Sequence, residues 1–367
     1  MQKQTERGSF TPPLTGRPRI TLAGAQYLFR KVVAHRPSVD LKTLACESWE
    51  IAPATDIRIA PAVFLDGHLA RVTGTDFTDD PLREMQGGWV SRQVATTAYR
   101  VKDAWLLDGA VYRGSAARWF CPRKRKVPPF LATEELDRAA IYTTVDGDGF
   151  FGLWLTDDCA TYLLAEQFGV PVTDDAAGAW HKPAYEALLG MKPARTGAMY
   201  LRDVVFFDDF GKNASRRERF AELGRRLRSR VPAQPHPGVF ILRGGTGKLR
   251  IMINESEVAE HMRSRHGFKV VDITTTDTLG IVQACTGAQV VMGVEGSQLI
   301  HGVAVMEPGA AVFALQPPYR FCGVIKRYTD LMDYRYAFVV GFPEGEAFRV
   351  DLDEVERTLE VLGKSAV

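Results

Sequence analysis

The most constraining feature of the sequence is a regular alternation of short apolar segments and amphipathic segments from Val239 onward. The apolar segments predict strands, and they are VFIL (239–242), KVVDI (269–273), AQVVMG (288–293) and AAVFAL (310–315). The segments between them predict helices, at 255–267, 276–287 and 297–307. Apolar strands that alternate with helices form a parallel sheet covered on both faces. We therefore expect a doubly wound domain whose ligand lies beyond the C-terminal ends of its strands.

The rest of the chain predicts a second domain. A chain of 367 residues is too long for one ordinary core. The proline-rich stretch VPAQPHPG (231–238) is the best candidate linker. We expect an N-terminal domain over 1–230, a nucleotide-binding domain over 237–345, and a closing helix over 350–363 that crosses back to the first domain.

The N-terminal half is harder to assign. Two stretches, 57–74 and 101–115, carry apolar runs split by Asp-Gly, which predicts β-hairpins. This half therefore has a β-rich start, and an α/β pattern follows from about residue 136.

Composition excludes several classes of protein. The formal net charge of +2 gives no reason to expect a nucleic-acid partner. The five cysteines are dispersed without a C-x-x-C pair, which favours reduced thiols over disulfides or a zinc framework. There is no apolar run of about 18 residues, so no membrane-spanning helix is expected.

A glycine-rich stretch follows the first strand of the C-terminal pattern. GGTGK (244–248) resembles the start of a phosphate-binding loop, but the triphosphatase pattern fails, since leucine follows the lysine where a hydroxyl residue is needed. The dinucleotide pattern G-x-G-x-x-G is also absent. What remains is Arg243, Lys248 and Arg250 around a strand end, followed by Asn254 and Glu255 at a helix start. Guanidinium groups can hold a diphosphate without a metal; a solvated basic loop with an Asn cap is the alternative.

A second loop follows the third strand. In GVEGSQLIHG, Gly293 and Gly296 bracket Glu295, and Ser297 starts a helix whose N-terminus offers free N–H groups to a phosphate. A tight turn with a serine cap is the alternative. Because both loops leave strands of one sheet, we expect them to converge on one ligand.

These two loops resemble glycosyltransferase family 61, divergent and of bacterial type. The pattern is Arg…Arg-x-x-x-Asn-Glu, a helix, G-x-x-G-[AS]-x-L-x-[NH], then Pro-Gly. The matching positions are Arg243, Arg250, Asn254, Glu255, Gly293, Gly296, Ser297, Leu299, His301, Pro308 and Gly309. In the first half, FFGLWLTDD (150–158) is similar to the family's aromatic-His-Trp-Leu-x-Asp motif.

The resemblance implies a GT-B-like fold, with two Rossmann-like domains facing across a cleft. It implies an inverting glycosyltransferase that moves a sugar from a nucleoside-diphosphate sugar to a hydroxyl of a glycan or lipid-linked glycan. Bacterial surface or capsular polysaccharide synthesis is the expected setting. No cofactor and no metal are expected, because arginines and a helix N-terminus can stabilise the leaving diphosphate.

The resemblance also implies the site residues. Asp157 matches the family's aspartate and is our candidate base, with Glu295 as the second candidate. The expected nucleotide-sugar-binding residues are Arg243, Lys248, Arg250, Asn254, Glu255, Gly293, Glu295, Gly296, Ser297, Gln298 and His301.

Three positions depart from the family pattern. Glu295 replaces a histidine between the two glycines, Leu153 replaces the first-half histidine, and Gly280-Ile281 replaces a Glu-Gln pair. These changes keep two alternatives open. One is a catalytically inactive module that binds a sugar nucleotide or a glycan. The other is a different GT-B enzyme, such as a sugar-nucleotide epimerase.

The cationic run at 123–126 bears on location. We expect a cytoplasmic protein, and this run could make a peripheral contact with the inner membrane. A solvated loop is the alternative for four basic residues. The sequence leaves the oligomeric state open.

Overall fold

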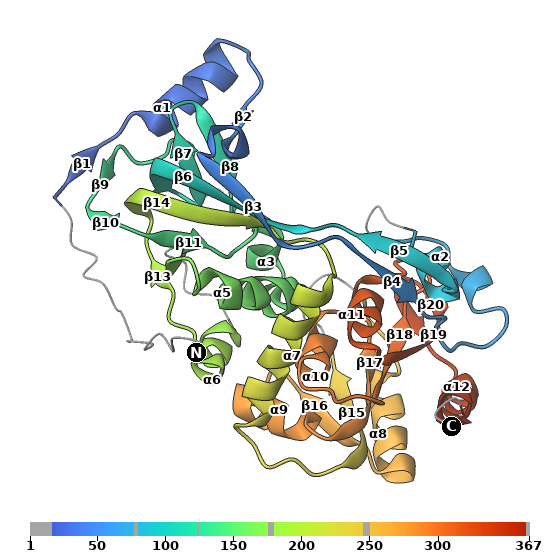
Figure 1. Cartoon of the computed structure of the whole chain (residues 1–367). Coiled ribbons are helices and arrows are strands. Elements are labelled where there is room, and N and C mark those ends of the chain that lie inside the picture. The colour runs from blue at the N-terminus through green and yellow to red at the C-terminus, as the bar shows by residue number, and fades with distance from the viewer. Residues whose placement is uncertain (1–16, 77–79, 123–124, 175–179, 245–249, 365–367) are drawn as a thin grey trace.

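The computed structural model of the protein describes residues 17–76, 80–122, 125–174, 180–244 and 250–364. It is a mixed α/β fold built on two large sheets (Figure 1). The sheet of the C-terminal half has five parallel strands in the order β16-β15-β17-β18-β19. Their bounds are β15 (His236–Leu242), β16 (Lys269–Asp272), β17 (Ala288–Val294), β18 (Ala311–Gln316) and β19 (Arg335–Val340).

Helices cover both faces of this sheet because its strands are apolar on both sides. Along β18, Phe313 and Leu315 pack into one core with α8 and α12, while Val312 and Ala314 pack into the other, with α9, α10 and α11. The helices are α8 (Glu255–His266), α9 (Thr278–Cys285), α10 (Ile300–Val303), α11 (Val324–Met332) and α12 (Leu352–Lys364).

Local sequence fixes where these helices begin and end. Asp277 caps α9 by accepting a hydrogen bond from the Gly280 amide at 2.7 Å. Gly267 ends α8 in a left-handed conformation that glycine adopts without strain. The predicted strands and helices at 239–293 and 310–315 are therefore confirmed, and the described chain ends in helix α12.

The N-terminal half contains a ten-stranded mixed sheet. Its main path is β13-β12-β11-β14-β6-β7-β8-β2, with β10 paired to β14 and β3 paired to β6. The strands from β13 to β14 are parallel, and β14 meets β6 in a long antiparallel pair. The bounds are β2 (Val39–Asp40), β3 (Glu47–Ala52), β6 (Thr96–Leu107), β7 (Ala110–Arg113), β8 (Ala116–Trp119), β10 (Glu134–Leu136), β11 (Ala139–Ile141), β12 (Val170–Thr173), β13 (Ala194–Arg195) and β14 (Ala198–Asp208).

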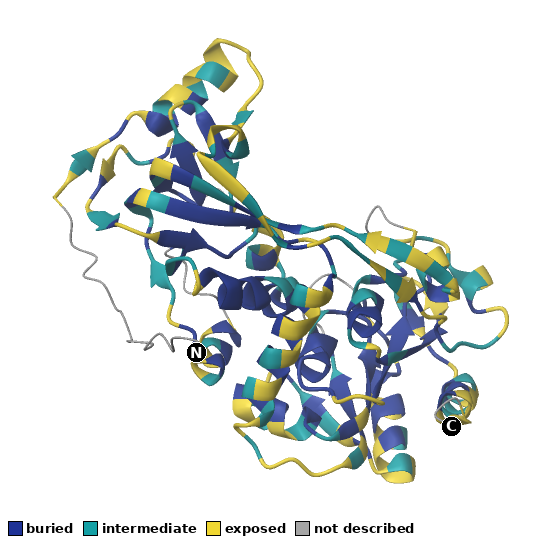
Figure 2. Cartoon of the chain, in the orientation of Figure 1, coloured by how far each residue is buried: buried dark blue, intermediate teal, exposed yellow. Residues whose placement is uncertain are grey.

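A layer of helices lies between the two sheets, and one apolar core runs through it (Figure 2). This core joins Phe207 of β14 and Tyr142 near β11 to Val291 of β17 and Phe338 of β19. The helices of the N-terminal half are α3 (Val145–Gly149), α4 (Phe151–Leu153), α5 (Cys159–Ala165), α6 (Lys182–Leu189) and α7 (Ala214–Arg228).

The described residues of the segment 53–94, which are 53–76 and 80–94, leave the large sheet and lie along the C-terminal sheet (Figure 1). Val63 makes a parallel bridge to Ala337 at the edge strand β19, and Thr75 makes one to Phe321. The segment contains β4 (Thr55–Ile59), α2 (Pro81–Gln86) and β5 (Trp89–Gln93). An early part of the chain therefore reaches the side of the C-terminal sheet at which its parallel strands end.

One predicted hairpin is confirmed and the other is wrong. Asp108-Gly109 joins β6 to β7 as expected. Asp66-Gly67 instead leads into a short 3-10 helix (Leu69–Arg71), and β4 pairs with β5, which comes 30 residues later in the chain. The segment after Asp66 bonds to the C-terminal half rather than folding back on β4, for example through His68 Nδ1, which accepts from the Val340 amide.

Two further features complete the chain. The predicted helix at 297–307 is shorter than expected, with a 3-10 turn (Ser297–Leu299) before α10. Helix α12 packs on the C-terminal sheet, and its Glu354 pairs with Arg71 of the first half. Short antiparallel pairs are β1 (Arg19–Ile20) with β9 (Leu131–Ala132) and β20 (Phe342–Glu344) with β21 (Ala347–Arg349).

None of the helices within the described ranges has the length and hydropathy needed to span a bilayer.

Candidate active site

Arg243 and Arg250, which flank the first glycine-rich loop, contact the second loop at the C-terminal edge of the five-stranded sheet. The two loops follow β15 and β17, which are neighbours at the point where the strand order reverses. Open parallel sheets bind ligands at such a point. Arg250 Nη1 donates to the Glu295 carbonyl at 2.8 Å, and this bond joins the two loops.

Three arginines converge at this edge. Arg243 and Arg250 are 7% and 8% exposed, and Arg320, after β18, joins them through Asp76. The Asp76 carboxylate accepts from Arg320 Nε at 2.7 Å and from Arg250 Nη2 at 3.3 Å. Burial, and then the nearby charge of Arg250, lower the pKa of Arg243 to about 10, so Arg243 is cationic at neutral pH.

One donor of Arg250 has no partner within the described ranges. Its Nε–H is buried and finds no acceptor among the residues that the structure describes. A buried donor without a partner costs free energy, and an oxyanion bound at this edge would satisfy it.

Glycine is required at two positions of the second loop. Gly293 has φ +158°, and a Cβ there would lie 2.5 Å from the Ile241 carbonyl oxygen. Gly296 has φ +155°, and a Cβ there would lie 1.9 Å from Arg243 Nη1. The loop after β17 can therefore approach β15 and Arg243 only because neither glycine carries a side chain.

Glu295 points into the arginine cluster. Its side chain is buried, and its carboxylate forms an ion pair with Arg250. The Cys322 thiol lies beside it, and burial followed by the Glu295 charge raises the pKa of that thiol. Glu295 thus neutralises one of the cations that were expected to hold a diphosphate.

Three predicted binding residues form hydrogen bonds that stabilise the site. Glu255 accepts from the backbone amides of Arg243 at 2.7 Å and Gly244 at 3.0 Å. Gln298 accepts from Arg243 Nη1 at 2.9 Å. The Asn254 side-chain amide is bonded to both backbone groups of Val350, at 2.9 and 3.2 Å. Lys248 lies outside the described residues.

His301 lies in a buried aromatic cluster between the two halves. Its Nδ1 is 2.8 Å from the Tyr185 hydroxyl, and its ring stacks on Phe151 with centroids 4.5 Å apart. Burial, then the neighbouring His181, lower the pKa of His301 well below its usual value. Its Nε2 has no hydrogen-bond partner within the described part of the chain. His301 is therefore a neutral imidazole in a packed environment.

The first-half motif lies against the second loop, since a Cβ at Gly152 would be 3.1 Å from Ser297 Oγ. At the end of the motif, Asp157 is 22% exposed and accepts from Lys212 Nζ and the Tyr328 hydroxyl, both at 2.7 Å. Burial opposes ionisation of Asp157, but Lys212 and then Arg216 outweigh it and lower the pKa. Asp157 is therefore ionised at neutral pH and anchored to α11.

Its neighbour Asp158 behaves differently. It is fully buried, and its carboxyl bonds to the Thr144 hydroxyl at 2.9 Å and to the Thr144 amide at 3.3 Å. Burial raises the pKa of Asp158 well above its usual value. Asp158 thus stabilises the turn after β11.

Sequence reasoning missed two residues of the arginine cluster. Arg320 follows β18, so its place after a parallel strand was a usable signal. Asp76 carried no signal, because it reaches the site only through the path of residues 53–94.

Comparison with known proteins identifies a family. Residues 126–313, just over half of the chain, match the family model for Glycosyltransferase 61. The chain therefore belongs to the glycosyltransferase 61 family, and the family implies an enzyme that transfers a sugar between a donor and an acceptor. A search of curated proteins finds no match.

Proposed function

We propose that the chain is an inverting, metal-independent glycosyltransferase whose donor is a nucleoside-diphosphate sugar. The observation that carries this proposal is the convergence of Arg243, Arg250 and Arg320 at the reversal point of a parallel sheet. A base takes the proton of the acceptor hydroxyl, whose oxygen attacks the anomeric carbon from the face opposite the leaving group. The bond from that carbon to the phosphate oxygen breaks, and the arginines stabilise the departing diphosphate.

Asp157 and Glu295 remain the two candidate bases. Asp157 is ionised and partly exposed, which supports a role with an acceptor. Glu295 is paired to Arg250, which supports a role in placing the donor. The same ion pair favours the alternative of an inactive binding module, because it occupies a phosphate-binding cation.

We further propose a GT-B arrangement with the donor on the C-terminal domain. Support comes from strand order: relative to the chain, the C-terminal sheet runs 2-1-3-4-5, and the path β13-β12-β11-β14 of the large sheet runs 3-2-1-4. Both are orders of doubly wound nucleotide-binding folds. The domains would be 1–230, 237–345 and 350–363, with residues 53–94 attached to the second.

The acceptor, the pathway and the compartment belong to the proposal as well. We propose a hydroxyl of a glycan or lipid-linked glycan as the acceptor, in bacterial surface polysaccharide synthesis on the cytoplasmic side.

The test is a binding titration of nucleoside diphosphates with Arg243→Ala. Loss of a charge-assisted bond costs about 1.5–3 kcal/mol, so we expect affinity to fall about tenfold to a hundredfold. Arg263→Ala, on the exposed face of α8, is the matched control and should bind normally. Equal affinity of both variants would remove the strand-end site.

Turnover assays separate the functional classes. Sugar transfer or slow donor hydrolysis is expected of a transferase, whereas binding without release of nucleoside diphosphate identifies the inactive module. Conversion of the sugar with the nucleotide still attached would identify an epimerase.

A further inference from the structure

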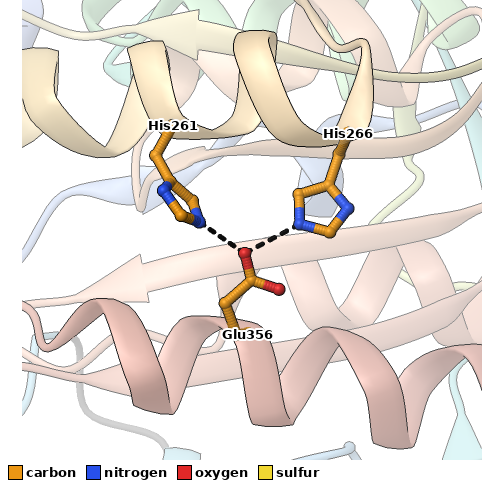
Figure 3. Close-up of side chains that lie close together, drawn as sticks. All are labelled: His261, His266 and Glu356. Carbon is orange, nitrogen blue, oxygen red and sulfur yellow. Dashed lines mark hydrogen bonds and ion pairs between the residues drawn. The ribbon is translucent and has the colours of Figure 1, made fainter.

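Three side chains with metal-binding chemistry meet between α8 and α12, on one face of the C-terminal sheet (Figure 3). Nε2 of His261 lies 2.5 Å from Oε1 of Glu356, and Nε2 of His266 lies 2.8 Å from the same oxygen. All three candidate ligand atoms lie within 4.8 Å of one another. The three side chains therefore already point at one common position.

The donor set fits a borderline transition metal. Two imidazoles and one carboxylate are ordinary zinc ligands, at about 2.0–2.2 Å, and three protein ligands leave a fourth position for water. Tetrahedral ligands at this distance lie about 3.3 Å apart, so small side-chain rotations would admit the ion. Each of the three side chains is about a quarter exposed, which leaves a path for the ion and its water. Mg²⁺ and Ca²⁺ prefer sites made of oxygens alone.

The backbone around the three ligands is well fixed. His261 lies within α8, and His266 is its last residue, immediately before the left-handed Gly267. Phe268 packs edge-on against the His266 ring, with centroids 6.3 Å apart. Glu356 lies near the start of α12, whose inner face is buried through Val355 and Leu362.

We propose that His261, His266 and Glu356 bind one divalent transition-metal ion, zinc above all, and that this ion fastens α12 to α8. The ion has no part in sugar transfer. Glu255, which holds the Arg243 backbone, lies at the other end of α8, and a helix of 12 residues is about 18 Å long. The simpler alternative is a metal-free hydrogen-bonded triad.

The test uses the full chain, freed of any histidine tag and stripped of metal. Titration with zinc chloride should show one tight site per chain and a rise of several degrees in Tm. The double variant His261→Ala/His266→Ala should lose the zinc-dependent rise, and Glu356→Gln should weaken zinc binding at least tenfold. The readout is the change on adding zinc within each variant, so a lower starting Tm does not confuse it.

Two controls make the result specific. His35→Ala removes an exposed histidine elsewhere and should leave zinc binding intact. Magnesium chloride should produce no shift. The proposal is overturned if wild type takes up no zinc, or if the double variant responds to zinc as wild type does.

A second, independent feature is an exposed apolar surface at the opposite end of the molecule. Helix α1 (Ala23–Leu28) and the π-helical turn after it (Phe29–Val33) project from the large sheet (Figure 1). Their inner face is held by Ala23 and Tyr27. The outward side chains are 60–62% exposed, and they are Leu22, Phe29, Val32 and Val33.

The segment that follows the cationic run lies beside this helix. Pro128 packs on Gly24, and the Thr21 amide donates to the Phe130 carbonyl at 2.9 Å. Val127 and Phe130 add exposed apolar area. Residues 123–124 lie outside the described part of the chain. From Arg17 to Val39 the sequence has five arginines and lysines and no acidic residue.

We infer that this surface docks on an anionic lipid membrane. Arg19 is paired with Glu135, and the other cations lie beside the apolar side chains. This combination matches the interfacial region of such a membrane, which offers both acyl chains and negative headgroups. For the test, this surface is defined by Leu22, Phe29, Lys31 and Val33.

Vesicles give the measurement. The full chain should sediment with vesicles containing about a third phosphatidylglycerol and should be released by salt. Phe29→Ser/Val33→Ser should lose this binding, whereas Val90→Ser, an equally exposed apolar residue on β5, should retain it. Binding by the double variant at the wild-type level would overturn the inference. So would self-association of the wild type that this double variant abolishes, because the surface would then be a protein interface.

Discussion

Charged side chains are arranged differently at the ends of the two arrays of parallel strands. At the end of β14 in the large sheet, the buried Asp209 accepts from Arg219 at 2.7 and 2.9 Å and from Thr96 and Thr161 at 2.9 and 2.8 Å. Burial alone would raise the pKa of Asp209, but Arg216 and Arg219 lower it to about 2. Here opposite charges alternate and satisfy one another.

At the ends of β15 and β18, three arginines share two carboxylates, those of Asp76 and Glu295. Arg243, Arg250 and Arg320 lie close together. Burial has the largest effect in lowering the pKa of Arg243, and the charges of Arg250 and Arg320 also lower it. Repulsion of this kind is unfavourable in the free protein and is relieved when an anion binds. Asp209 therefore pairs with the buried arginines of the large sheet, whereas three arginines and two carboxylates at the C-terminal sheet leave an excess positive charge that a bound anion would balance.

Kinetic measurements on variants of the two candidate bases will show whether Asp157 or Glu295 is the base. Loss of a general base lowers kcat by about 10²–10⁴-fold. If Asp157 is the base, Asp157→Asn should show this loss, and Glu295→Gln should mainly raise the donor KM. The reverse pattern would identify Glu295, which lies in the arginine cluster, as the base. Wild-type kinetics in both variants would refute both assignments.

Stability should respond most strongly at the large sheet. Asp209→Ala leaves Arg216 and Arg219 buried without their carboxylate, and breaking such a pair costs about 3–5 kcal/mol. Chemical denaturation should show this loss. Asp56→Ala, which breaks an exposed pair with Arg92, is the control and should change stability by under about 1 kcal/mol.

Substitution of an arginine at the C-terminal sheet should weaken ligand binding. Arg320→Ala should weaken nucleoside-diphosphate binding about tenfold or more, because one charge-assisted bond is lost. Its Tm should change little, since Arg320 is the most exposed arginine of the cluster. A large fall in Tm with unchanged affinity would reverse our distinction between the two edges.

Acid should lower the free energy of unfolding through Asp209 of the large sheet. Because the folded pKa of Asp209 lies below its unfolded value near 4, its contribution is complete above about pH 4 and is lost as pH falls towards 2. The contribution is about 2 kcal/mol. Unfolding free energies measured across this range should fall for wild type, and the slope should be shallower in Asp209→Asn.

Chelation should leave turnover unchanged, which is the smallest effect we expect. The proposed countercharge of the arginine edge comes from side chains and the start of a helix rather than from a metal. Excess EDTA should lower Tm through the His261, His266 and Glu356 cluster while turnover persists. Loss of turnover that manganese or magnesium restores would place a metal at the reaction centre.

Local patterns predicted the C-terminal sheet well because its signals are local. Apolar strands, the Asp277 cap and the Gly267 helix end are each encoded within a few residues. The same patterns failed at Asp66-Gly67, where the chain bonds to residues some 270 positions away. Asn254 likewise satisfies its amide on Val350, a partner that no local motif could identify.

The path of residues 53–94 has a consequence for how the chain is made. Val63 pairs with Ala337, a residue synthesised 274 positions later. At about 5–20 residues per second, the early segment waits roughly 15–50 s on the ribosome before its partner strand exists. Asp76 waits with it, so the arginine edge cannot be completed until the C-terminal strands emerge. A nascent chain stalled before β18 would carry the first-half motif and Arg243, yet it would lack both Arg320 and the surface on which Asp76 comes to rest.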